Sequence, residues 1–79
     1  MVANFPKDIY EIDFIIYERY NIHNYKYIFC CIDIYSRYAE CIPTTNMTND
    51  TIIKCLKIIF ESMGKPNKIK CDNNLIPVR

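Results

Sequence analysis

The sequence TIIKCLKIIFESMGKP, residues 51–66, has the spacing of a single amphipathic helix. Thr48, Asn49 or Asp50 can cap its start, because their side-chain oxygens accept hydrogen bonds from the first turn. Gly64 followed by Pro66 is a strong signal for its end, since proline cannot continue a helix. The apolar positions that predict a core-facing stripe are Ile52, Ile53, Leu56, Ile59, Phe60 and Met63.

Short β-type segments lie on both sides of this helix. Residues 67–71 have the pattern of a strand that follows it, and residues 38–42 that of a strand before it. Pro43 is expected to end the latter, because proline cannot donate to a ladder of hydrogen bonds. The apolar run at residues 25–35 predicts a strand buried on both faces, and residues 9–17 predict a first strand.

The order of these elements predicts a mixed sheet. Residues 18–24 are polar and turn-prone, so the first three strands are expected to form an antiparallel meander. A strand, a helix and a strand in succession form a crossover, and crossovers join parallel strands. The fourth strand is therefore expected beside and parallel to the first, with the helix covering its outer edge. This is an α/β fold with an α+β-like mixed sheet of four strands and one crossover helix.

Length and charge limit the class of protein. The 79 residues allow one domain at most. The formal net charge of +1 gives no support for DNA binding, which usually appears as a basic excess. Lys65, Lys68 and Lys70 form a small basic cluster that is expected to be a solvated strand edge.

The cysteines indicate an intracellular protein. The five cysteines are odd in number, lie in apolar segments and follow no signal peptide, so reduced thiols are expected rather than a secreted disulfide framework. One histidine, His23, and no suitable ligand spacing exclude a zinc site. No apolar run is long enough to cross a membrane.

Two aspartates lie where strands rarely carry charge. Asp13 interrupts the first strand, on the face opposite to Tyr10 and Ile12, and Asp72 directly follows the fourth strand. Ligand sites form outside the carboxyl ends of parallel strands, so Asp13 and Asp72 are expected to come close enough to share a divalent metal. The alternative is that Asp13 faces water and that residues 72–74 form an ordinary turn.

These pieces, in this order, resemble the catalytic core of retroviral-type integrases and related transposases. The resemblance runs from about Phe5 to Asn74 and depends on Ile12-Asp13-Phe14, on Asp33-Ile34-Tyr35-Ser36-Arg37-Tyr38, and on Ile69-Lys70-Cys71-Asp72-Asn73. The versions in Maverick/Polinton-type elements and virophages look most similar. Asn74 departs from the pattern, because the family commonly has glycine there.

The resemblance implies a partial ribonuclease H-like fold and a function in DNA integration. In that family three carboxylates bind two Mg²⁺ or Mn²⁺ ions for DNA cleavage and strand transfer. Asp13 and Asp72 match the first two as catalytic and metal-binding residues. The third, a glutamate on a later helix, has no counterpart in residues 1–79, so this partial core domain is expected to be inactive alone. Asp33 is expected to be a strand-end and turn residue.

The partners implied by the resemblance are DNA and other copies of the chain, without a membrane or an organic cofactor. The implied location is the nucleus or a viral or transposon nucleoprotein complex. Two other readings stay open: a non-catalytic remnant that acts as a small nucleic-acid-associated or dimerising module, and an unrelated four-stranded domain with incidental acids. A helix-borne glutamate encoded downstream would favour the integrase.

Overall fold

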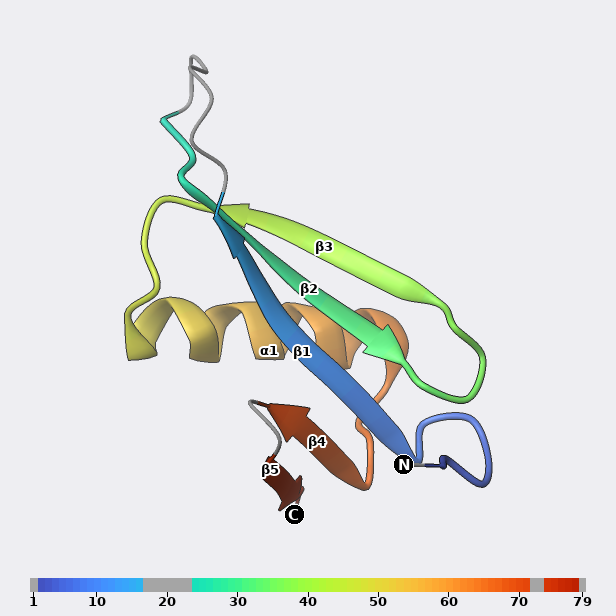
Figure 1. Ribbon diagram of the computed structural model, residues 1–79. Coiled ribbons are helices and arrows are strands. Elements are labelled where there is room, and N and C mark those ends of the chain that lie inside the picture. Colours follow the sequence, from blue (N-terminus) through green and yellow to red (C-terminus); the bar gives the residue numbers. More distant parts are fainter. Residues whose placement is uncertain (1, 17–23, 72–73, 79) are drawn as a thin grey trace.

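The chain forms a sheet with one helix packed on it (Figure 1). The computed structural model describes residues 2–16, 24–71 and 74–78, so most of the predicted loop at 18–24 lies outside the described residues. The elements in chain order are β1 (Ile9–Ile16), β2 (Tyr27–Asp33), β3 (Ala39–Thr44), α1 (Asn49–Met63), β4 (Lys68–Cys71) and β5 (Asn74–Pro77).

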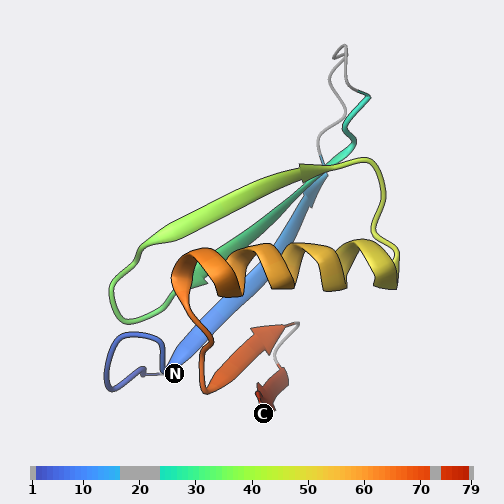
Figure 2. The ribbon, with the colours of Figure 1, turned by 180° about the vertical axis from the view of Figure 1, so that it is seen from behind.

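The strand order confirms the predicted topology. The sheet has the order β3-β2-β1-β4-β5, with β1 and β2 antiparallel, β2 and β3 antiparallel, and β1 and β4 parallel. Helix α1 provides the crossover between β3 and β4 and lies across one face of the sheet (Figure 2). The view in Figure 1 is onto the opposite face, which we call the open face because no described helix covers it.

A fifth strand was not predicted. β5 pairs antiparallel with β4, with Ile76 opposite Ile69 and Leu75 opposite Lys70. The expectation that the helix covers the outer edge of β4 is therefore wrong, because β5 covers it. The segment is only 4 residues long, which is too short for strand alternation to distinguish it from a loop.

Strand β3 passes through Pro43, so the prediction that Pro43 ends the strand is wrong. Antiparallel partners alternate between hydrogen-bonded and non-hydrogen-bonded pairs. The Asp33 N–H donates to the Tyr38 carbonyl at 2.8 Å, and counting along the register from this pair puts Ile28 and Pro43 in a non-hydrogen-bonded pair. The missing N–H of Pro43 thus removes no bond to β2, and the edge position of β3 tolerates it.

The core lies between α1 and one face of the sheet. Tyr10 of β1 and Phe29 and Cys31 of β2 pack with Cys55 and Ile59 of the helix. On β2 the intervening residues are only half-buried, so the expectation that this strand is buried on both faces is wrong. The alternation predicted for β1 is confirmed from Tyr10 to Phe14: Tyr10 belongs to the core, and Ile12 and Phe14 pack against it. Ile16, at the end of the strand, is exposed.

Both ends of α1 are held by specific hydrogen bonds. Thr48 caps the start, with its side-chain oxygen accepting from the Thr51 N–H. Gly64 ends the helix, and its N–H donates to the Phe60 carbonyl at 3.0 Å. The Tyr10 hydroxyl reaches the same end, where it contacts the carbonyls of Met63 at 3.0 Å and Gly64 at 2.8 Å. Among the described residues, no helix has the length and hydrophobicity needed to cross a membrane.

Candidate functional site

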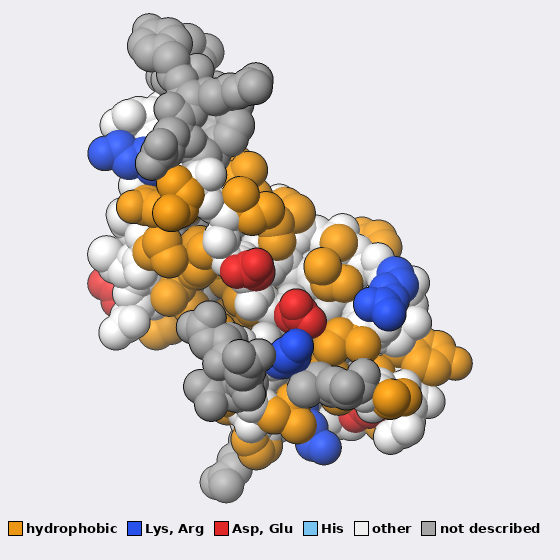
Figure 3. Space-filling model, in the orientation of Figure 1, with side chains coloured by type: hydrophobic (Ala, Val, Ile, Leu, Met, Phe, Trp, Pro, Cys, Tyr) orange, Lys and Arg blue, Asp and Glu red, His pale blue; other side chains and the backbone are white. Residues whose placement is uncertain are grey.

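The open face carries acidic side chains near its centre. Figure 3 shows them in the middle of this face, beside a basic side chain and surrounded by apolar ones. Strand alternation explains the arrangement, because odd-numbered residues of β1 point away from the helix. Glu11 and Asp13 therefore share the open face, at neighbouring positions of the strand in the middle of the sheet.

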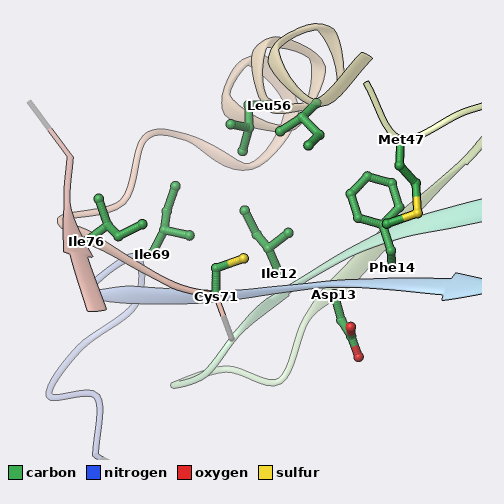
Figure 4. Close-up of a pocket in the computed structure, with 9 residues that line it drawn as sticks. Ile12, Asp13, Phe14, Met47, Leu56, Ile69, Cys71 and Ile76 are labelled. Carbon is green, nitrogen blue, oxygen red and sulfur yellow. The ribbon is translucent and has the colours of Figure 1, made fainter. Parts of the chain in front are cut away.

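Asp13 has an exposed carboxylate. The residue lies opposite Cys30 of β2, and its side chain points away from the apolar side chains of Ile12 and Phe14 (Figure 4). No hydrogen bond or salt bridge joins Asp13 to another described residue. This exposed carboxylate is therefore accessible to a cation from solvent.

Glu11, on the same face, is already paired. It lies opposite Lys70 of β4 in the parallel register, and Lys70 Nζ is 3.7 Å from Glu11 Oε2. A partly exposed pair of this kind contributes about 0–1 kcal/mol to stability. Lys65 and Lys68 are exposed, but Lys68 and Lys70 both lie on β4, which is an interior strand between β1 and β5. The expectation that the basic cluster forms a strand edge is therefore wrong.

Asp72 lies outside the described residues, so its proximity to Asp13 stays a prediction. The described strands give the register that leads to it. β1 and β4 are parallel, with Glu11 opposite Lys70. In the sequence Asp13 lies two residues after Glu11, and Asp72 lies two residues after Lys70. Among the residues that the structure describes, no group of three or more His, Cys, Asp or Glu side chains is arranged to hold a metal ion.

Asp33 is a strand-end residue, as predicted. Its buried carboxylate accepts from the backbone N–H of Lys7 at 3.2 Å and of Tyr35 at 3.1 Å. It lies opposite Tyr10 in the register, on the helix side of the sheet and not on the open face. The acid thus fixes the turn after β2. His23 lies outside the described residues.

An apolar hollow that the sequence did not predict lies on the other side of the sheet from the acids. It has a volume of about 530 Å³ beneath α1 and next to β4, where Leu56, Ile69 and Ile76 contribute to its walls (Figure 4). Asp13 also borders it, but the carboxylate points to the opposite face. A part of this wall comes from β5, and the pattern of β5 was too short to be recognised as a strand.

The family model of the integrase core domain matches residues 3–74, which is most of the chain. No curated protein matches the sequence. The mixed sheet, with β4 parallel to β1 and one crossover helix, is that of a partial ribonuclease H-like domain.

Proposed function

Because the chain belongs to the integrase core domain family, we propose that its open face takes part in metal-dependent cleavage and strand transfer of DNA phosphodiesters during DNA integration. The observation that carries the proposal is the exposed carboxylate of Asp13, which has no hydrogen bond or salt bridge to another described residue. It lies on the strand parallel to the one that Asp72 follows in the sequence. We assign Asp13 and Asp72 as catalytic and metal-binding residues.

The chemistry of these donors fits a hard divalent cation. Carboxylate oxygens are the ligands that Mg²⁺ and Mn²⁺ prefer, and no described residue competes for Asp13. Asp13 and Asp72 would hold the ion, which when bound would polarise a phosphate oxygen and neutralise its charge. The chain's own contribution is a rigid backbone, because Asp13 lies opposite Cys30 of β2, on a strand whose first residues also pair with β4.

Lys70 makes the two acids of β1, Glu11 and Asp13, different from each other. Its ammonium lies 3.7 Å from the Glu11 carboxylate and partly offsets that charge, whereas no described cation pairs with Asp13. A cation is therefore attracted to Asp13 more than to Glu11. This difference makes Glu11 the matched control for any test of the site.

The sequence resemblance supports two narrower proposals. The order of motifs favours an origin in a Maverick/Polinton-type element or a virophage. A DNA-integrating core acts on DNA, so we propose that the chain is located in the nucleus or in a viral or transposon nucleoprotein complex. We also propose that copies of the chain assemble on the DNA there.

Calorimetric titration with Mg²⁺ and Mn²⁺ tests the proposed site. Asp13→Asn and Asp72→Asn each remove a charged ligand, so we expect the apparent affinity to fall by about tenfold or more, which corresponds to about 1.4 kcal/mol. Glu11→Gln is expected to change the affinity by less than about twofold, because this carboxylate is engaged by Lys70. Circular dichroism checks that all variants fold. An Asp13→Asn variant that binds metal as the wild type does would contradict the proposal.

A further inference from the structure

Two thiols meet on the open face, in the row of the sheet that contains Asp13. Cys30 of β2 and Cys41 of β3 lie directly opposite each other, and their sulfurs are 3.0 Å apart. Both are free thiols; Cys41 is exposed and Cys30 is half-buried. Asp13 lies opposite Cys30 on the other side of β2. The pair has no role in the proposed metal chemistry.

The backbone register brings the two side chains together. Counted from the hydrogen-bonded pair of Asp33 and Tyr38, Cys30 and Cys41 form a non-hydrogen-bonded pair, as do Ile28 and Pro43. Side chains are closest in such pairs, in which the two Cβ atoms can approach to about 4.5 Å. The two Cβ atoms of a disulfide are about 3.5–4.5 Å apart, so this pair needs little movement to form one. β3 is an edge strand, so a small adjustment of its position disturbs no further strand.

We propose that Cys30 and Cys41 form a cross-strand disulfide when the chain meets a low-molecular-weight disulfide such as oxidised glutathione. The Cys41 thiolate, formed by loss of its proton to solvent, attacks one glutathione sulfur and releases the first glutathione as a thiolate. Cys30 then loses its proton and its sulfur attacks the Cys41 sulfur, which releases the second glutathione thiolate. Two thiols are oxidised, one glutathione disulfide is reduced, and the two protons end on the two glutathione molecules.

The order of attack follows from the surroundings of the two thiols. Cys41 is exposed on the edge strand β3 and is open to an external disulfide, whereas Cys30 is half-buried on β2, between β1 and β3. Cys41 is therefore the thiol that reacts with the external disulfide, and Cys30 is the thiol that resolves the intermediate.

The remaining cysteines do not compete for Cys41. Cys31 and Cys55 are buried in the core, where burial raises the pKa of both thiols. Cys71 lies on the helix side of the sheet, near Ile12 and Ile69 (Figure 4). The open face of the described sheet thus presents one thiol pair, and this inference does not depend on the proposed metal site.

Thiol mapping by mass spectrometry tests the pairing. The reduced wild-type chain is incubated with oxidised glutathione, its remaining thiols are alkylated, and the chain is digested with trypsin. We expect a monomer with two fewer alkylated cysteines and a disulfide that links peptide 27–37 to peptide 38–54. Peptide 27–37 contains both Cys30 and Cys31, and we expect fragment spectra to place the bond at Cys30. A substitution of the buried Cys31, which could unfold the chain, is therefore not needed.

Matched variants complete the test. Cys30→Ala and Cys41→Ala are each expected to abolish the linked peptide, whereas Cys71→Ala is expected to retain it. A Cys31–Cys41 bond, a lasting mixed disulfide of glutathione at Cys41 in the wild type, a disulfide-linked dimer as the main product, or full alkylation of every cysteine would each overturn the proposal.

Discussion

Tyr10 is the residue that ties the middle strand to the end of the helix. Its ring is fully buried, and its hydroxyl lies within hydrogen-bond distance of the carbonyls of Met63 and Gly64. Burial, followed by the negative charge of Asp33, raises the pKa of Tyr10 from 10.0 to about 12. The face that Tyr10 occupies was predictable from strand alternation, but its partners were not, because they are 53 and 54 positions away in sequence.

The raised pKa of Tyr10 predicts a loss of stability at alkaline pH. The unfolded chain releases this proton near pH 10 and the folded chain near pH 12, so the stabilising contribution is complete below pH 10 and is lost as the pH rises toward 12. Burial, followed by the negative charge of Glu40, raises the pKa of Cys31 from 9.0 to about 12, and this shift also lowers stability as the pH rises. Urea unfolding between pH 7 and pH 11 should therefore show a fall in the free energy of unfolding that begins near pH 9.

Tyr10→Phe separates the contribution of the hydroxyl. Its loss should lower the free energy of unfolding at neutral pH by about 1–3 kcal/mol and make the decline above pH 10 shallower. Tyr38→Phe is the control, because Tyr38 is exposed. A pH profile of Tyr10→Phe parallel to that of the wild type would show that Tyr10 does not contribute.

At the scale of elements, the helix was the most predictable part. The Thr48 cap and the Gly64 stop are local signals, and the structure has both where the sequence predicts them. The predicted apolar stripe is confirmed in part: Ile59 is buried, but Ile53 is exposed, and Cys55, which was not predicted to face the core, is buried instead. The other errors concern strands. Pro43 stays within β3 because the register gives it a position without a bond to β2, and β5 is defined by pairing with β4 rather than by its own pattern.

The cap of α1 gives a prediction for this element. Thr48→Ala removes the oxygen that accepts from the Thr51 N–H at 3.3 Å, so the free energy of unfolding should fall by about 1 kcal/mol. Thr45→Ala, the same change at a nearby exposed position before the helix, should alter it by less than about 0.5 kcal/mol. Thermal or urea unfolding of the two variants measures the difference, and equal effects would contradict the role of Thr48 as the cap.

At the scale of the whole molecule, the two faces of one sheet have separate roles. The helix face holds the core and the apolar hollow, and the open face holds Asp13 and the thiol pair. The crossover rule was sufficient to predict that β1 and β4 are parallel, since it depends only on the order of elements. The thiol pair was not predictable, because it depends on which residue of β3 lies opposite Cys30.

Paramagnetic NMR with Mn²⁺ tests the metal site most directly. Mn²⁺ added to the isotope-labelled chain should broaden the amide signals of Asp13, Cys30 and Asp72 first, because the effect falls steeply with distance from the ion. The signals of Cys55 and Ile59, in the helix on the other side of the sheet, should persist at the same Mn²⁺ concentration. Asp13→Asn should abolish the selective broadening, and Glu11→Gln should retain it. Broadening centred elsewhere, or unchanged in Asp13→Asn, would contradict a divalent-metal site on the open face.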